Sequence, residues 1–451
     1  MQAEKVPCTY FDGYPVSKMQ RRIFIIVILG YLFDQIDNLN FGILGPALIK
    51  NFGATVQQIA YISSVYFLGM FIGGLLGGTL ADRFGRKKTF LYSLFAFSLI
   101  SFINAFATSV NFLAVCRFLT GIGLASMTVI SISYIAEMTP CESRGRWQSL
   151  VLLVCSLGMP ILTGFFKFII PLNHEAWRVV FVVGALGFLP GILGVFCLRE
   201  SPRWLVSKGR YKEAEEIMRE LVPGLTLDLS KEKETPKIKL SLQLAEIFGS
   251  KYIKYSILLI FAAIMFFPAT FAFLNLAPAL LVKKGFSLEA GLTLAWLGTV
   301  GSPIGFILAT FLTDKGGRKI PLVVSYIIVG ICSMTYGYVG NLNLIYASYM
   351  MFYACQGFLG SVLFAYIPEN FSNRVRSTAS GIVWAIARPA TSLLQLLVPI
   401  IVLKYGNLIL YIILGCFYLA GGIAIAIFGR RTAGLNLEEL HRDTMKTATT
   451  R

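Results

Sequence analysis

The sequence predicts an all-α integral membrane protein. Twelve transmembrane helices are expected to form two pseudo-symmetric six-helix bundles (6+6) joined by a cytoplasmic linker. Three observations predict this fold: a low content of charge, twelve long apolar stretches, and motifs that occur twice. Of the 451 residues, 56% are hydrophobic and only 14% are charged, whereas soluble domains carry about 25% charged residues. So few charged side chains cannot cover a water-soluble body, which excludes a cytosolic enzyme and a disordered chain.

Twelve stretches of the chain are apolar over the length of a membrane span. A transmembrane helix needs about 20 apolar residues, and these stretches are too continuously apolar for the alternating strands of a membrane barrel. The expected spans are residues 22–48, 56–80, 89–107, 111–137, 146–170, 179–198, 255–282, 289–312, 321–339, 342–367, 378–402 and 408–428.

Lysine and arginine predict the orientation. With the N-terminus placed in the cytoplasm, 32 of the 40 Lys and Arg residues fall in inner segments. Because cytoplasmic loops carry the excess of positive charge, we expect both termini in the cytoplasm of a multi-pass protein of the cell inner membrane. The net charge of +17 therefore reflects topology, and we expect the lipid bilayer rather than a nucleic acid as its partner.

A change of composition after Arg199 divides the chain. Residues 199–254 are rich in Lys and Glu and contain a stretch with charges at helical spacing. The expected organisation is an N-terminal six-helix bundle, a cytoplasmic linker with a surface helix, a C-terminal six-helix bundle and a cytoplasmic tail, at residues 1–198, 199–254, 255–428 and 429–451 respectively.

Two motifs recur at matching positions of the two halves, which indicates an internal duplication. The loop after the second span contains Asp82, Arg83 and Arg86, and the loop after the eighth contains Asp314 and Arg318. Spans four and ten end at Glu137 and Glu369, and pairs of arginines follow each, among them Arg144, Arg374 and Arg376. We expect these charges to form a cytoplasmic gate of breakable ion pairs: Asp82 bound to Arg83 and Arg86, Glu137 to Arg144, and Glu369 to Arg374 or Arg376. The alternative is that they only set topology.

These residues carry a family resemblance. The Asp82-Arg83-x-Gly85-Arg86 loop, its second copy and the 6+6 plan resemble the major facilitator superfamily. Asp34-Gln35-Ile36-Asp37 in the first span is similar to the Asp-x-x-Asp signature of the aromatic acid:proton and metabolite:proton symporter branch, although Gln35 stands where that branch usually has Gly. Sugar porters and organic-ion transporters are related branches, but the paired glutamines of sugar porters are absent here.

Charged residues inside the membrane indicate function by default. Asp37 lies about 22 Å from the inner end of its helix and Arg117 about 10 Å below the outer surface, so the two meet at nearly the same depth. Asp34 lies three residues from Asp37 and shares its helix face. We expect Asp34, Asp37 and Arg117 to couple protons, as similar pairs do in sugar porters; the alternative is a static ion pair that only fixes helix packing.

Arg388 lies near the middle of the eleventh span, next to Pro389. A guanidinium binds carboxylates through two parallel hydrogen bonds, and among the organic-ion transporters an Arg in this helix separates anion from cation carriers. We expect Arg388 to bind an anionic substrate, or alternatively to pair with Asp34 or Asp37. The other expected substrate-binding residues are polar or aromatic: Asn275, Gln356, Phe271, Tyr349, Tyr353 and Trp384. The alternative for the Phe and Trp residues is that they face lipid or fill the core, whereas the amides of Asn275 and Gln356 need a polar partner within the membrane.

The expected function is therefore proton-coupled uptake of a small organic anion, an aromatic or hydroxy-carboxylate metabolite, by alternating access. We expect a monomer with no enzyme activity, no catalytic residue, no metal and no cofactor, driven by the proton gradient. Two alternatives stay open. One is a proton-linked exporter of drugs or organic cations, which Gly158-Met159-Pro160 disfavours because it departs from the antiporter motif; the other is a non-transporting sensor on the same fold.

Overall fold

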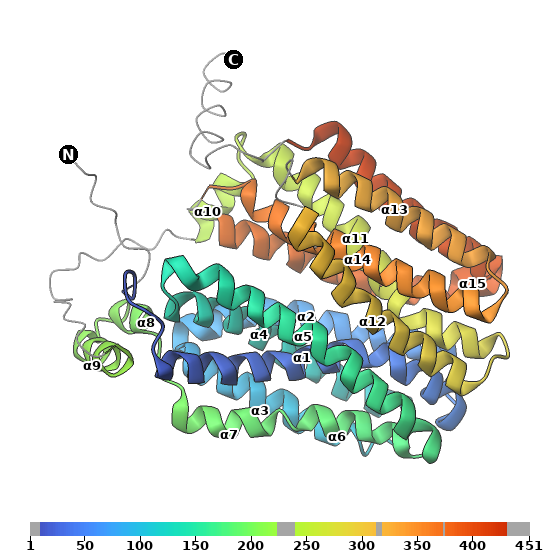
Figure 1. The fold of residues 1–451 in the computed structure, drawn as a ribbon, viewed down its shortest axis with the longest axis horizontal. Helices are drawn as coiled ribbons and strands as arrows, with labels where there is room; N and C mark the ends of the chain where they lie inside the picture. The colour runs from blue at the N-terminus through green and yellow to red at the C-terminus, as the bar shows by residue number, and fades with distance from the viewer. Residues whose placement is uncertain (1–9, 223–239, 313–317, 373–374, 431–451) are drawn as a thin grey trace. The chain divides into compact units, whose positions relative to one another are not determined.

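A computed structural model describes residues 10–222, 240–312, 318–372 and 375–430. Within these ranges every regular element is a helix (Figure 1). The chain separates into two compact units. Unit 1 comprises Met1–Asn40, Leu68–Leu162 and Ala176–Pro236; unit 2 comprises Phe41–Phe67, Thr163–Glu175 and Lys237–Arg451.

Unit 1 is built mainly from helices of the N-terminal half. Its complete helices are α3 (Arg86–Asn104), α4 (Val110–Met138), α6 (Val179–Ala185), α7 (Phe188–Cys197), α8 (Pro202–Val206) and α9 (Tyr211–Leu221). Three helices contribute a part of their length: α1 (Lys18–Asn51), α2 (Val56–Phe84) and α5 (Cys141–Ile169). The helix α4 begins where the Ser109 side chain accepts a hydrogen bond from the Phe112 amide, which satisfies a free N–H of the first turn.

Unit 2 contains the helices of the C-terminal half: α10 (Leu240–Ile247), α11 (Ile253–Lys283), α12 (Leu288–Leu312), α13 (Lys319–Tyr338), α14 (Leu342–Glu369) and α15 (Arg376–Phe428). The remaining parts of α1, α2 and α5 belong to it, together with the short turn η1 (Ile170–Leu172). The expected spans 378–402 and 408–428 both lie in α15. Gly406 interrupts this helix with a φ of 82°, a conformation that glycine adopts without a steric penalty.

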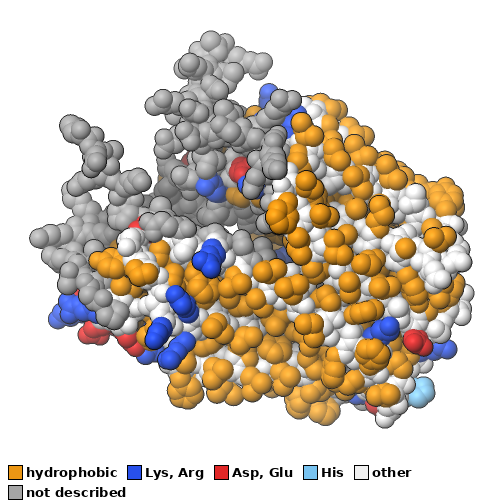
Figure 2. All heavy atoms as spheres, in the orientation of Figure 1, with side chains coloured by type: hydrophobic (Ala, Val, Ile, Leu, Met, Phe, Trp, Pro, Cys, Tyr) orange, Lys and Arg blue, Asp and Glu red, His pale blue; other side chains and the backbone are white. Residues whose placement is uncertain are grey.

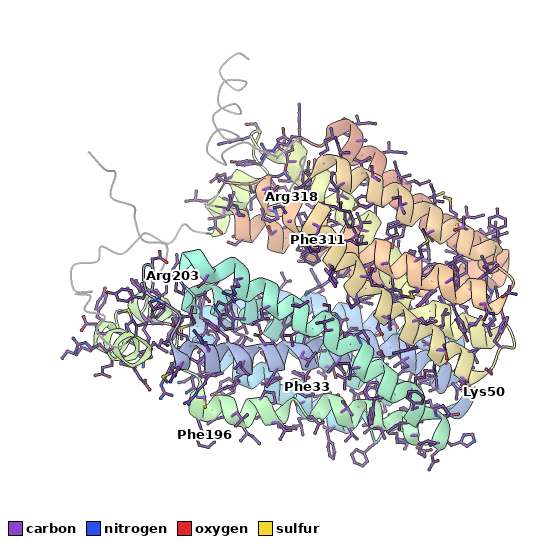
Figure 3. The ribbon with its side chains drawn as sticks, viewed as in Figure 1. Phe33, Lys50, Phe196, Arg203, Phe311 and Arg318 are labelled. Carbon is purple, nitrogen blue, oxygen red and sulfur yellow. The ribbon has the colours of Figure 1, made fainter. Side chains whose placement is uncertain are left out.

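Among the described residues, nine segments are long and apolar enough to cross a membrane. The two parts of α1, Lys18–Asn38 and Phe41–Asn51, add a tenth if they are counted as one span. Figure 2 shows hydrophobic side chains over most of the visible described surface. Phe196 of α7 and Phe311 of α12 are 73% and 70% exposed and point away from their neighbours (Figure 3). An apolar exterior of this kind suits a lipid environment.

Within each half, glycines bring one pair of helices into backbone contact, and the two pairs occupy matching positions. A Cβ atom at Gly73 of α2 would lie 2.2 Å from the Ile122 carbonyl oxygen of α4. A Cβ atom at Gly305 of α12 would lie 1.9 Å from the Ala354 carbonyl oxygen of α14. Small residues that repeat along a helix allow such close approach in membrane proteins. Because α2–α4 and α12–α14 occupy corresponding places in the two halves, this shared packing supports the duplication that the motifs indicate.

Candidate functional site

Asp37 and Arg117 form an ion pair inside unit 1. Arg117 Nη1 donates to Asp37 Oδ2 at 2.6 Å, and Nη2 donates to the Asp37 carbonyl oxygen at 3.3 Å. Both side chains have no exposed surface. The expectation that α1 and α4 bring these two residues together is confirmed. A buried pair of this kind is tightly coupled, because loss of either charge leaves the other in a medium that solvates it poorly.

Two residues that the sequence did not single out complete the surroundings of this pair. The Ser101 hydroxyl of α3 lies 3.4 Å from Asp37 Oδ1 and 3.2 Å from the Phe181 carbonyl oxygen. Gly184 of α6 packs against both groups, since a Cβ atom there would lie 2.6 Å from Ser101 Oγ and 3.5 Å from Asp37 Oδ1. Ser101 had one signal, a polar side chain in an apolar span; Gly184 had none.

Asp34 has a different environment from Asp37. Its side chain is 1% exposed, and Oδ2 accepts hydrogen bonds from Thr128 of α4 at 2.8 Å and from Gln35 at 3.1 Å. Cys155 of α5 lies close enough to interact with the Asp34 carboxyl electrostatically. The two carboxyls therefore contact different parts of α4, one beside an arginine and the other beside a hydroxyl group.

The expected substrate-binding residues all lie in unit 2. Phe267 joins two of them, with ring centroids 4.8 Å from Phe271 and 5.6 Å from Trp384, and Trp384 stacks on Phe364 at 4.1 Å. Phe67 of α2 adds a further ring at 4.9 Å from Phe271. These side chains form a continuous aromatic row that runs from α2 through α11 and α15 to α14.

Tyr349 and Tyr353 occupy the interior of the helix bundle. Their ring centroids lie 5.1 Å apart, Tyr349 has no exposed surface, and its hydroxyl donates to the Leu274 carbonyl oxygen. This placement is that of packing residues, and a substrate contact for them stays a prediction. Asn275 is 2% exposed, whereas Gln356 and Arg388 are half-buried.

Charged residues gather where α2 and α4 of unit 1 end. Arg86 binds Glu137 at 3.0 Å and Asp82 at 2.9 Å. The expected partner of Glu137 was Arg144, but the ion pair that the structure shows is with Arg86; the Arg144 side chain lies outside the described residues. Arg86 reaches Glu137 because it begins α3 and its side chain turns toward the end of α4. Arg83 instead lies over the Phe84 ring at 5.3 Å.

Glu200 of the linker connects this cluster to α3. Its Oε1 accepts hydrogen bonds from the amides of Arg86 at 2.6 Å and Lys87 at 3.1 Å, as a carboxylate does at a helix N-terminus. Burial raises the pKa of Glu200, although these amides and the Arg86 charge favour the ionised form. Gly85 makes room for the carboxyl, because its φ is 98° and a Cβ atom would lie 2.2 Å from Glu200 Oε2. The sequence predicted a gate here but not the role of Glu200.

The corresponding place in unit 2 carries one ion pair. Arg318, labelled in Figure 3, binds Glu369 at 2.7 Å. The expected partners of Glu369 were Arg374 or Arg376, whereas the ion pair found among the described residues is with Arg318. Arg376 interacts with Glu369 electrostatically, but its Nε and Nη2 have no hydrogen-bond partner in the described part of the chain. Asp314 and Arg374 lie outside the described residues.

The two ion pairs are related by the duplication. In both halves, an arginine that follows the second helix binds the glutamate at the end of the fourth. The matched pairs are Arg86–Glu137 and Arg318–Glu369. Sequence spacing predicted which residues take part, but which arginine reaches the glutamate depends on how each helix is rotated.

The chain is similar to known transporters over most of its length. The model of the "Sugar (and other) transporter" family matches residues 23–444. The putative metabolite transport protein YyaJ of Bacillus subtilis is 31% identical over 93% of this chain and 94% of its own length. The niacin transporter NiaP of Acinetobacter baylyi is 26% identical over 95% of this chain and 98% of its own length. The gallate transporter of Pseudomonas putida is 27% identical over 84% of each chain.

Among solved structures, the xylose transporter XylE from E. coli, in a partially occluded inward-open conformation, is similar with a TM-score of 0.76. It is 20% identical, over 93% of this chain and 100% of that one. This likeness concerns the fold. The helical architecture, the apolar spans and the family match over nearly the whole sequence all indicate a membrane transporter. The family and these relatives carry the names of transporters, not of enzymes. The protein is a multi-pass membrane transporter that belongs to the sugar (and other) transporter family.

Proposed function

We propose that the protein imports a small organic anion, an aromatic or hydroxy-carboxylate metabolite, together with protons. The observation that carries this proposal is the fully buried Asp37–Arg117 pair at 2.6 Å. A proton that binds Asp37 removes the negative partner of Arg117, so protonation and the contact between α1 and α4 are thermodynamically linked. An imposed proton gradient thereby drives a change in helix packing. Asp34, bound to Thr128, is the second candidate for the proton.

The substrate class rests on Arg388 and on the aromatic row that contains Phe271 and Trp384. A guanidinium binds a carboxylate, and the rings offer stacking faces for an aromatic substrate. Relatives named for niacin and gallate support this choice, because both compounds are aromatic carboxylic acids.

The proposed arrangement comprises twelve transmembrane helices in two six-helix bundles, which transport the substrate by alternating access. Both termini lie in the cytoplasm, the membrane is the cell inner membrane, and the protein acts as a monomer. The proton gradient is the energy source, without a cofactor. The positive-inside distribution of 32 of the 40 Lys and Arg residues supports the orientation.

The test of proton coupling is uptake into proteoliposomes with an imposed pH gradient. Radiolabelled nicotinate, gallate and 4-hydroxybenzoate serve as substrates, and export of organic cations is measured in parallel. The wild type should accumulate an acid, whereas Asp37→Asn should lose accumulation and retain exchange of labelled for unlabelled substrate. Glu220→Gln is the control, because it removes a carboxylate from an exposed ion pair with Arg199. Gradient-driven uptake that survives in Asp37→Asn contradicts the proton role.

Substrate binding is tested separately at Arg388. Arg388→Ala should weaken binding of nicotinate, measured by its competition with the labelled acid, because the carboxylate loses its cationic partner. Binding of the neutral amide nicotinamide should change little in the same variant. Unchanged nicotinate affinity in Arg388→Ala would overturn this site.

A further inference from the structure

Unit 2 contains a group of buried polar side chains on α2 and α15 that the proposed site does not use. Ser64 of α2 and Ser392 of α15 share a hydrogen bond of 2.8 Å. Ser63 precedes Ser64 on α2, and Gln395 follows Ser392 by three residues on α15. Their side chains are 1% and 0% exposed, respectively. The Ser63 hydroxyl and both amide atoms of Gln395 have no hydrogen-bond partner within the described ranges.

These residues continue the helix face on which Arg388 lies. Arg388, Ser392 and Gln395 follow one another at intervals of four and three residues, so they share one face of α15. Gln395 lies about 10 Å along the helix from Arg388, in the direction away from Arg376, where α15 begins. The hydrogen bond between Ser64 and Ser392 places α2 over this face.

The aromatic row lies next to the same contact. Phe67 follows Ser64 by three residues on α2, and its ring packs against Phe271. The part of α2 that contacts Ser392 therefore also contacts one of the expected substrate-binding rings. The contact of α2 with α15 through Ser64 and Ser392 and the contact of α2 with α11 through Phe67 and Phe271 therefore lie within one turn of α2.

An unpaired buried amide is costly, because it has lost its water and gained no partner. A leucine at position 395 would avoid this penalty in the packed state. The Gln395 amide gains partners when α2 moves away from α15, because this exposes the face that leads to Arg388. Its N–H₂ group then donates to a carboxylate and its carbonyl oxygen accepts from a hydroxyl group.

We propose that Gln395 and Ser63 form a second subsite for the organic acid, on the side of the membrane opposite the linker. The acid binds there first, with its carboxylate on the Gln395 amide and its ring beside Phe67, and then passes to Arg388. The contact between Ser64 and Ser392 closes behind it. This inference rests on the proposed function, since it assumes an organic acid as the substrate, but it does not depend on proton coupling.

The test compares the two sides of the membrane. Exchange of 4-hydroxybenzoate is measured without a pH gradient in right-side-out and inside-out vesicles that contain wild type, Gln395→Leu or Ser63→Ala. Gln395→Leu should raise the apparent KM about tenfold on the side opposite the linker and leave the KM on the linker side within twofold. Leu393→Ala is the matched control, because Leu393 lies on the same helix and is 60% exposed.

A second measurement reports whether the site opens. A membrane-impermeant maleimide should label Gln395→Cys from the side opposite the linker, and added 4-hydroxybenzoate should slow this labelling. Equal KM changes on both sides, or a Gln395→Leu variant that gains thermal stability while both KM values stay unchanged, would refute the subsite. Wild-type vesicles that exchange the acid but show no net uptake under an imposed pH gradient would refute proton coupling alone. Wild-type vesicles that exchange no organic acid would refute both proposals.

Discussion

The buried ion pair of α1 and α4 gives the sharpest prediction. Asp37→Asn or Arg117→Gln leaves one full charge without its partner, in a place where neither side chain has exposed surface. Breaking a buried pair costs about 3–5 kcal/mol. The exposed pair Arg199–Glu220, with side chains 30% and 41% exposed, is the matched comparison and should contribute no more than about 1 kcal/mol.

A double-mutant cycle measures this difference. Unfolding free energies in mixtures of mild detergent and dodecyl sulfate are determined for wild type, Asp37→Asn, Arg117→Gln and the double variant. Because the double variant contains no unpaired charge, it should be more stable than either single variant, and its proton-driven uptake should still be lost. Two results would refute the reasoning. One is that each single variant lowers the free energy of unfolding by less than about 1 kcal/mol; the other is that the double variant lowers it by the sum of the two single-variant losses.

Three further predictions concern packing, the linker and the surroundings of Asp37. Gly73→Val should cost about 1–3 kcal/mol of stability in thermal unfolding, because the Ile122 carbonyl lies 2.2 Å from the new Cβ atom, whereas Gly78→Val should have little effect since that position faces open space. Gly184→Ala should slow proton-driven uptake by displacing Ser101 from Asp37, and unchanged uptake would show that this contact is dispensable. Burial raises the pKa of Glu200, so the folded state holds the proton more tightly than the unfolded state and stability falls as the pH rises from about 4.5 through the raised value. Glu200→Gln should remove this decline in melting curves recorded against pH, and a decline that persists would assign it to another group.

Much of the functional interpretation was accessible from single residues. The depth of Asp37 and Arg117 along their helices predicted that they meet, because the rise of a helix is constant and an apolar span has few places for a charge. The gate residues Arg86, Glu137 and Glu369 were likewise predicted from their repeated spacing. In the structure Glu137 binds Arg86 and Glu369 binds Arg318, while two of the expected partners, the Arg144 side chain and Arg374, lie outside the described residues.

Other features had no signal in the sequence. Gly184 is one of 42 glycines, and only its position beside Ser101 and Asp37 distinguishes it. Tyr349 had the same appearance as a pocket residue, yet it lies in the bundle interior. Hydrophobic composition does not distinguish a ring that lines a cavity from one that fills a core, because both avoid water.

The sequence by itself determined that this is a helical membrane protein, that its halves carry matching motifs, and which few charges lie among apolar residues. These properties follow from local composition, since each span must be apolar over its own length. The tertiary structure decided other contacts between side chains: Arg86 binds Glu137, and Ser64 binds Ser392 one helix turn from Gln395, whose amide has no hydrogen-bond partner among the described residues. Such contacts depend on the rotation and register of helices far apart in the chain, which glycine-mediated packing sets.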